Sequence, residues 1–212
     1  VRVRVRGQIQ GASDLRPMTY FVLLHRTDNP NDPGPVPAVL PPWGGNGFAT
    51  SSQPGTQGFV GFVQYDSAGY GLYSLELAGV LHRPEERIFQ YLGTPEFSIS
   101  PRPGERDLFF QIDLSRLPNP TARWCLINVV ATDNLPATPE DQPKLWDALE
   151  DGTQASSPQP WVVLDTTVND RRTNSLTLKE PSWLDVRDRQ YGPAIDEPNL
   201  DIVDWEFEIQ RQ

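Results

Sequence analysis

The chain has 212 residues, 37% hydrophobic and 10% aromatic, which is enough for one large all-β domain with a real core. Its net charge of −10 argues against nucleic acid, whose phosphates attract basic surfaces, and against docking on an anionic membrane surface. No run approaches the roughly 20 apolar residues that span a bilayer. The 22 prolines and 16 glycines predict short strands, long ordered loops and little helix.

The two ends of the chain alternate between apolar and charged residues. Residues 1–11, VRVRVRGQIQG, place valines on one side and Arg2, Arg4 and Arg6 on the other, while residues 202–212, IVDWEFEIQRQ, alternate apolar residues with carboxylates. Period two over this length predicts two half-buried strands. Opposite charges across a strand pair contribute roughly 0.2–1 kcal/mol each, so we predict that these strands are neighbours in one sheet. The alternative is that each charged row is only a solvated face.

Three apolar runs in the first half predict strands. Residues 19–26, TYFVLLHR, are almost continuously apolar, which is typical of a central strand covered on both faces. Residues 59–65 and 70–77 are also apolar, and the connection between them is hairpin-sized and ends in Gly69. The last two runs are therefore expected to pair as a hairpin.

Two further runs, 108–114 and 124–131, are rich in Phe, Ile, Val and Leu. Both are too short for a typical helix and are bounded by turn residues, so we predict two strands that pair as the central hairpin of a β-sandwich. The weaker elements are candidate strands at 87–92, 96–100, 161–165 and 175–179 and one helical turn at 144–149.

Long loop insertions at about 27–58, 135–160 and 180–200 separate these runs. The first is dominated by Pro, Gly, Asn, Asp and Ser, which fix turns, and a loop of this length is uncommon unless it is functional. We expect its apolar residues to fasten it to the sandwich as an ordered flap: Val36, Val39, Leu40, Trp43 and Phe48. The predicted fold is a single domain over 1–212, an antiparallel β-sandwich of jelly-roll or immunoglobulin-like type.

The segments LFFQIDLSRL, INVVATDN, KLWDALEDG and WVVLD follow one another in the second half of the chain. Their order resembles DOMON-like and family-9-like carbohydrate-binding sandwiches over roughly residues 96–165. In those domains an Asp-Leu-Ser-type turn, an Asp-Asn-type loop and a tryptophan-bearing loop follow successive strands. The first half, with HRTDNPNDPGPVP and PPWGGNGF, looks like a motif block of exported bacterial proteins of unknown function. The resemblance implies a jelly-roll-like sandwich outside the cytoplasm that binds sugar, haem or another protein.

Motifs for catalysis are weak. The two histidines, His25 and His82, accompany no Gly-x-Ser-x-Gly elbow and no zinc-ligand spacing. Cys125, the single cysteine, lies within an apolar run and is expected to be a buried hydrophobe. A glycan-active enzyme would need two carboxylates roughly 5–10 Å apart, one with a raised pKa. Nothing singles out a pair among the candidate carboxylates, which are Glu96, Asp107, Asp113 and Glu140. We therefore expect a protein that is not an enzyme.

Oxygen donors cluster at the start of the first long loop. Calcium takes about six to eight oxygens from carboxylates, amides and backbone carbonyls, and turn-rich loops supply all three. The candidate ligands of a structural calcium are Asp28, Asn29, Asn31 and Asp32. The alternative is that these residues form Asx-turns. Haem would need axial Met or His, and Met18 lies at the opposite end of its strand from His25, which leaves a pairing of Met18 with His82 and makes haem an unfavoured cofactor.

Tryptophans on loops are the strongest functional clue. Trp43 lies in the stiff, sterically open segment PPWGGNG, and Trp146 and Trp183 also fall outside the predicted strands. Flat indole faces stack on sugar rings, and Asn46 and Asp147 are placed in sequence to bond sugar hydroxyls. The same residue types suit a protein interface. The alternative is that these tryptophans only fasten long loops to the sandwich.

These features predict a non-catalytic binding or assembly module whose partner is a carbohydrate or another protein. The chain opens on Val1 with no initiator Met, which is consistent with an exported protein whose N-terminal segment is removed, and equally with truncation. We expect it outside the cell or in the cell envelope. The rival functions are a structural subunit of a larger extracellular or envelope assembly, and a glycan-active enzyme that uses an acidic pair.

Overall fold

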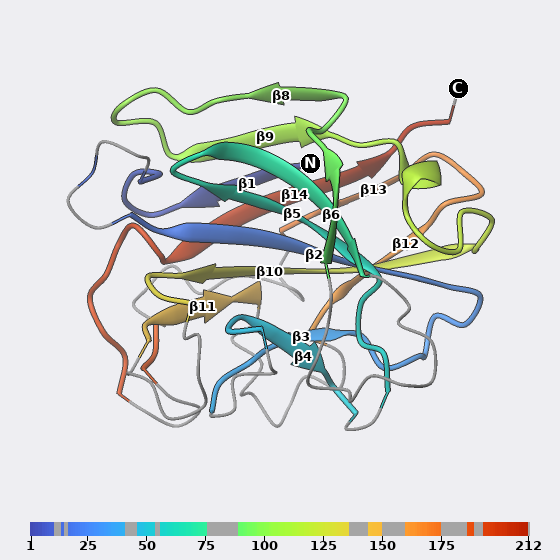
Figure 1. Cartoon of the computed structure of the whole chain (residues 1–212), viewed down its shortest axis with the longest axis horizontal. Coiled ribbons are helices and arrows are strands. Elements are labelled where there is room, and N and C mark those ends of the chain that lie inside the picture. The colour runs from blue at the N-terminus through green and yellow to red at the C-terminus, as the bar shows by residue number, and fades with distance from the viewer. Residues whose placement is uncertain are drawn as a thin grey trace.

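The computed structural model describes residues 1–10, 14, 17–40, 46–53, 56–75, 89–135, 144–149, 160–174, 186–188 and 193–211. Two antiparallel sheets lie face to face in these residues, which confirms the expected all-β sandwich (Figure 1). The five-stranded sheet has the order β13 (Asp170–Thr173), β14 (Ile202–Ile209), β1 (Arg2–Val5), β9 (Asp107–Gln111) and β8 (Phe97–Ile99).

The second sheet has seven strands among the described residues. Its order is β11 (Trp146–Ala148), β10 (Trp124–Thr132), β2 (Thr19–Thr27), β5 (Gly61–Asp66), β6 (Gly69–Leu75) and β7 (Phe89–Gly93), and β12 (Val162–Asp165) pairs with the other end of β10. A 3-10 helix, η2, spans Leu114–Arg116. No helix in the described part of the chain is long and apolar enough to cross a membrane.

A third layer covers part of the outer face of the seven-stranded sheet. It is formed by the small sheet of β3 (Pro35–Pro37) and β4 (Ala49–Ser51), which lies below β10 in Figure 1. Phe48 is 3% exposed and stacks on Phe21 of β2 with ring centroids 3.9 Å apart. The expected flap is thus fastened by Phe48 and by the partly buried Val39, whereas the side chain of Leu40 is half exposed.

Strand β2 is apolar almost throughout because both of its faces are covered. Tyr20, Val22 and Leu24 point into the core between the two large sheets, and Phe21 and Leu23 point into the smaller core under the flap. Side chains alternate along a strand, so a strand with two apolar neighbouring layers needs apolar residues at every position. The predicted central position of this strand is confirmed, with β10 on one side and β5 on the other.

The first and last strands are neighbours, as their charge patterns predict. β1 pairs with β14 in a register that places Arg2 opposite Glu206 and Arg4 opposite Asp204. A salt bridge of 2.7 Å joins Arg2 to Asp204 on the outer face of the sheet. The predicted hairpin of β5 and β6 is also confirmed, with Asp66 opposite Gly69, whose φ of +99° suits glycine.

The predicted central hairpin is wrong, because β9 and β10 belong to different sheets. β9 pairs with β1 and β8, and β10 pairs with β2, β11 and β12. The connection between β9 and β10 contains η2 and Asn119, whose φ is 58°, and it carries the chain from one sheet to the other. Both strands face the same core from opposite sides, which gives them the similar apolar patterns that suggested pairing.

The predicted helical turn at 144–149 is also wrong. Residues 146–148 form strand β11, in which Ala148 pairs with Val130 and Trp146 pairs with Thr132. All three residues of β11 are fully buried. A segment this short takes its conformation from the sheet edge that it joins, because a single helical turn is unstable by itself. Strands β7, β8 and β12 lie at the weaker sites predicted for them, and 175–179 is outside the described residues.

Candidate functional site

The predicted ligand-binding residues do not form one exposed group. Trp43 and Trp183 lie outside the described residues. Trp146 and Asp147 are both 0% exposed, and Asp147 accepts a hydrogen bond of 2.6 Å from the backbone N–H of Ile202. Asn46 accepts from the N–H groups of Phe48 and Ala49 at 2.9 Å each, so it caps a turn of the flap. In the described structure these three side chains act as scaffold.

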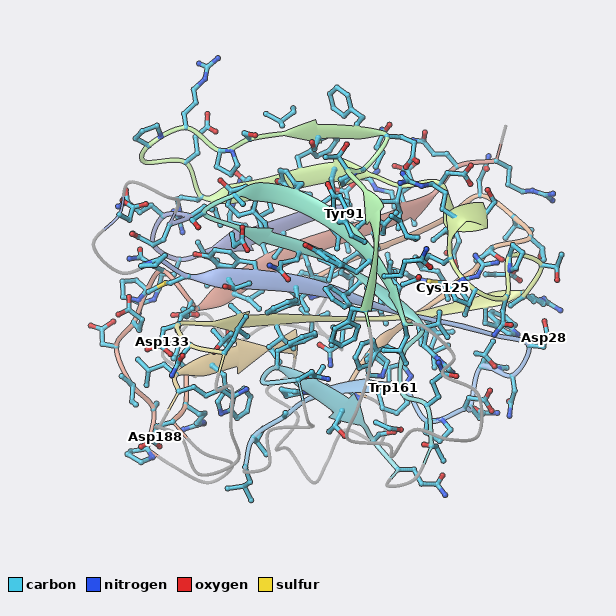
Figure 2. All side chains as sticks on the ribbon, in the orientation of Figure 1. Asp28, Tyr91, Cys125, Asp133, Trp161 and Asp188 are labelled. Carbon is cyan, nitrogen blue, oxygen red and sulfur yellow. The ribbon has the colours of Figure 1, made fainter. Side chains whose placement is uncertain are left out.

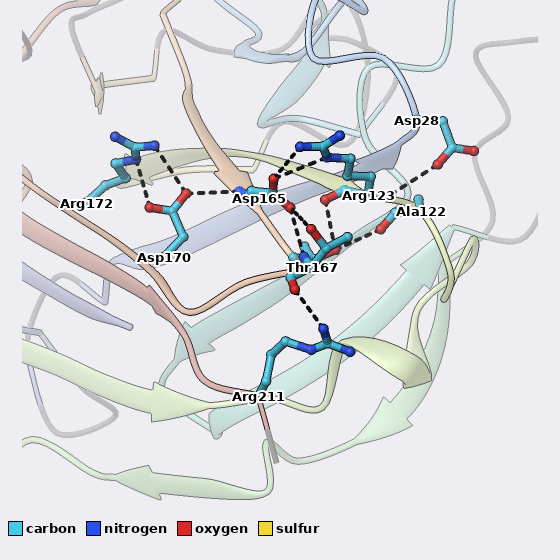
Figure 3. A network of polar contacts seen from close by, with 9 residues as sticks. Asp28, Ala122, Arg123, Asp165, Thr167, Asp170, Arg172 and Arg211 are labelled. Carbon is cyan, nitrogen blue, oxygen red and sulfur yellow. Dashed lines mark hydrogen bonds and ion pairs between the residues drawn. The ribbon is translucent and has the colours of Figure 1, made fainter.

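Three of the four predicted calcium ligands are joined to one another by hydrogen bonds, together with Thr27. Asn29 accepts from the N–H of Asn31 at 3.1 Å and donates to Asp32 at 2.9 Å, and Asp32 also accepts from the hydroxyl of Thr27. Asp28 faces away from this loop and accepts from the N–H of Arg123 at 3.1 Å (Figure 3). In the part of the chain that the structure describes, no group of three or more His, Cys, Asp or Glu residues is placed to hold a metal ion. These contacts match the Asx-turn alternative, and calcium binding stays a prediction.

A larger polar network lies beside Asp28 and joins the two sheets (Figure 3). Asp165 on β12 accepts from Thr167 and from Arg123, and these bonds lower the pKa of its carboxyl to about 2. The backbone N–H of Asp165 donates to Asp170, which begins β13. The carboxylates of this network are occupied by donors of the protein itself, so we assign the network a structural role.

The carboxylates considered for glycan hydrolysis are also engaged in structural contacts. Asp107 is paired with Arg4, and Asp113 caps η2 by accepting from the N–H of Ser115 at 2.8 Å. Burial raises the pKa of Glu96, but hydrogen bonds from Arg116 and from the N–H of Asp113 lower it by more. The pKa of Asp113 is also lowered, by its bonds from Ser115. Neither Glu96 nor Asp113 has the raised pKa that a general acid needs, and Glu140 is outside the described residues.

A buried lysine fastens the flap to the sheet. Lys144 is 0% exposed, and its Nζ donates a hydrogen bond of 2.7 Å to the carbonyl of Gly47, next to the turn that Asn46 caps. Burial lowers the pKa of Lys144 to about 7, and the nearby carboxylate of Asp133 opposes that shift. The hydrogen bond to Gly47 thus adds a polar contact to the apolar packing of the flap, and the apolar setting of the Lys144 amine favours its neutral form.

The exposed feature that best suits a ligand is a pair of tyrosines on neighbouring strands. Tyr73 of β6 lies directly opposite Tyr91 of β7, with ring centroids 5.3 Å apart and planes at 54°. Tyr91 is 58% exposed and lies at the front of the molecule in Figure 2. Both side chains are on the outer face of the seven-stranded sheet, the face that carries the flap.

The Tyr73 ring is supported by a buried aromatic ring beneath it. It stacks on Phe62 with ring centroids 4.9 Å apart and planes at 14°, and Phe62 packs edge-on against Phe89 at 4.9 Å. A Cβ at Gly71 would lie 2.7 Å from the Tyr73 ring, so glycine allows the ring to lie across the strand. Rigid support of this kind lowers the entropy that a side chain loses on binding.

Two polar side chains lie on the same face of β5, next to these rings. Gln64 pairs with Gly71 in the sheet and donates a hydrogen bond of 2.5 Å to Asp66, which also accepts from the N–H of Ala68 at 2.7 Å. Burial raises the pKa of the Tyr73 phenol, and the charges of Asp66 and then of Tyr91 add to the shift, so its hydroxyl remains a donor. We call this set the tyrosine surface: Gln64, Asp66, Gly71, Tyr73 and Tyr91.

The sequence does not point to this surface, because its tyrosines lie within predicted strands and the tryptophans in loops are the more conspicuous aromatic residues. The alternation in 69–75 does place Gly71 and Tyr73 on one face, but the strand opposite them is not readable from that pattern. No family model, curated protein or solved structure matches the chain.

Proposed function

We propose that this protein is a non-catalytic binding module and that the tyrosine surface binds a neutral carbohydrate chain. The observation that carries the proposal is the cross-strand pair of Tyr73 and Tyr91, with Tyr91 58% exposed on an open sheet face. Aromatic rings with a polar tip suit ligands that have both apolar and hydroxyl-bearing faces. A sugar ring has such faces.

The polar neighbours of the two rings supply complementary hydrogen bonds. Gln64 donates through its amide nitrogen to Asp66, which directs its amide oxygen to other donors such as sugar hydroxyls. Asp66 keeps acceptor capacity beyond the bonds from Gln64 and Ala68, because a carboxylate has about four lone-pair sites. Acceptors beside an aromatic platform favour a polyhydroxylated ligand over a purely apolar one.

The negative charge of the protein favours a neutral glycan over an anionic one. The chain carries a net charge of −10, and Asp66 stands beside the rings, so uronate or sulfate groups would be repelled. We place the module outside the cell or in the cell envelope, as the resemblance of residues 96–165 to secreted sandwiches implies. A structural calcium in the 28–32 loop stays part of this proposal.

Isothermal titration calorimetry with defined oligosaccharides tests the proposal. The probes are hexasaccharides of β-1,4-linked glucose, xylose and N-acetylglucosamine, with oligogalacturonate as the anionic control. We expect at least one neutral probe to bind and the anionic probe not to bind. Tyr91→Ala should weaken binding by about tenfold, which corresponds to the loss of one aromatic contact.

Two variants separate stacking from other effects. Tyr91→Phe keeps the ring and should bind nearly as well as the unmodified chain, whereas Phe97→Ala removes an exposed aromatic ring from a different strand and should leave affinity unchanged. Absence of binding to every neutral probe would overturn the proposal. So would equal affinity of the unmodified chain and Tyr91→Ala, because the ligand would then lie elsewhere.

A further inference from the structure

A second exposed apolar group lies at the other sheet, on strand β8. Phe97 is 47% exposed and Ile99 is 52% exposed, and both lie on the outer face of the five-stranded sheet beside the half-buried Phe109 of β9. β8 is the last strand of this sheet among the described residues and lies at its top edge in Figure 1. Edge strands with exposed apolar side chains are sites where another strand adds to a sheet.

The hydrogen bonds of β9 fix which backbone groups of β8 face outward. Phe110 exchanges both of its backbone bonds with Val1, at 3.0 and 3.2 Å, so its polar groups point toward β1. Successive residues of an antiparallel strand point to opposite sides, so Phe109 and Gln111 point toward β8. The backbone groups of their partners, Ile99 and Phe97, therefore point toward β9. Ser98 directs its N–H and C=O to the other side, where the described residues supply no further strand.

We propose that β8 pairs with β8 of a second copy of this chain, antiparallel and centred on Ser98. In this register the two Ser98 residues exchange both backbone hydrogen bonds. Phe97 of each copy then lies opposite Ile99 of the other copy, on the same outer face of the sheet. Aromatic residues opposite β-branched residues are favourable cross-strand pairs. The two five-stranded sheets become one continuous sheet with a two-fold axis at Ser98.

The charges along β8 are compatible with this register. Two residues beyond Ser98 in either direction, Glu96 of one copy lies opposite Ser100 of the other, so no carboxylate faces a carboxylate. Glu96 is also paired with Arg116 and accepts from the N–H of Asp113 at 2.6 Å. The net charge of −10 on each copy opposes association through longer-range repulsion, which added salt screens. The dimer is therefore expected to strengthen as salt is added to a dilute buffer.

Sedimentation equilibrium of the full chain over roughly a hundredfold range of concentration measures the association. Ser98→Pro removes the outward N–H without removing a bond to β9, and an edge strand is the place in a sheet where proline is tolerated. We expect this variant to weaken the dimer by at least about tenfold, because two backbone bonds at the axis are lost together. Tyr91→Ala, at the proposed sugar surface, should leave the association unchanged, so the two proposals fail independently.

Cross-linking tests the register itself and does not depend on the proline variant folding. Ser98→Cys places two thiols at the axis with Cα atoms about 5.5 Å apart, within the range that a disulfide spans. Ser100→Cys is the matched control, since the two copies of residue 100 would be separated by about four residues along the strands. Residue 100 is also the more exposed of the two, so random oxidation would favour it.

Mild oxidation is expected to link Ser98→Cys chains into dimers and to leave Ser100→Cys chains monomeric. Cys125 is buried, so it is not expected to form disulfides with the introduced cysteines. A monomer at all concentrations would overturn the proposal and would leave the β8 edge to a strand from a different protein. A dimer in which Ser100→Cys cross-links as readily as Ser98→Cys would also overturn it.

Discussion

Arg4 holds Asp107 through two parallel hydrogen bonds, from Nε to Oδ1 and from Nη2 to Oδ2, both 2.9 Å long. This pair joins β1 to β9 in the middle of the five-stranded sheet, one strand away from the proposed dimer edge. A forked guanidinium–carboxylate contact is the geometry in which an ion pair contributes most to stability. Both side chains are about one-third exposed, so solvent reduces that contribution.

Replacing Asp107 by Asn should lower the free energy of unfolding by about 1 kcal/mol, because the side chain that accepts both bonds from Arg4 loses its negative charge. Asp204→Asn is the matched comparison, since Asp204 accepts a single bond of 2.7 Å from Arg2 on the same face. Urea unfolding followed by fluorescence measures both variants. The loss in Asp107→Asn should be the larger and should shrink in high salt. Equal losses would contradict the importance given to the forked geometry.

The hydroxyl of Tyr70 bridges the two large sheets. It accepts a hydrogen bond of 3.1 Å from the N–H of Phe109 and donates one of 3.3 Å to the carbonyl of Ile99. Tyr70→Phe leaves both backbone groups without this partner, so we expect a loss of about 1–3 kcal/mol in unfolding free energy. Hydrogen exchange at the Phe109 amide should accelerate in this variant. Tyr91→Phe, whose hydroxyl is on an exposed side chain, is the control and should change neither quantity.

Lys144 should make stability depend on pH. Its folded pKa, about 7, lies below the ordinary value of 10.5, so above pH 7 the unfolded chain binds a proton that the folded chain has released. The unfolding free energy should therefore rise with pH between about 7 and 10, by at most about 1.4 kcal/mol per pH unit. Lys144→Met keeps the aliphatic volume and should remove this rise.

The comparison is made between the two chains at each pH, so that titration of other groups cancels. The pKa values of Tyr20 and Tyr70 are raised by burial, which lowers stability above pH 10 in both chains and limits the useful window to lower pH. Parallel pH profiles for the unmodified chain and Lys144→Met would show that Lys144 keeps its ordinary pKa in the folded state.

The 28–32 loop can be tested for calcium and for its own hydrogen bonds together. Asp32 accepts from the hydroxyl of Thr27 and from the side chain of Asn29, so Asp32→Ala should lower stability by about 1 kcal/mol with or without calcium. Thermal unfolding is measured in calcium and in chelator for both chains. A calcium-dependent rise in Tm that disappears in Asp32→Ala would support the predicted ion site and would show that the hydrogen bonds alone do not describe the loop.

Several features of the fold were predictable because their signals are local. The alternation of Arg2 and Arg4 with valines, and of Asp204 with Trp205, identifies both the buried faces and the charges that pair across them. The continuous apolar run of β2 identifies a strand covered on two sides. The pairing of β9 with β10 was predicted wrongly because strands that face each other across a core carry the same apolar pattern as strands that lie side by side.

The candidate site was likewise predictable only in part. By itself, the sequence determined that the chain folds as an all-β sandwich, that its ends pair, and that a proline-rich flap packs on it through apolar side chains. The tertiary structure decided which aromatic residues stay exposed, because Phe48 covers Phe62 and Phe89 while Tyr91 on the same face is left open. It also decided that β8 is the last strand of its sheet among the described residues, since the neighbours of a strand are set by pairings across the whole chain that no local pattern encodes.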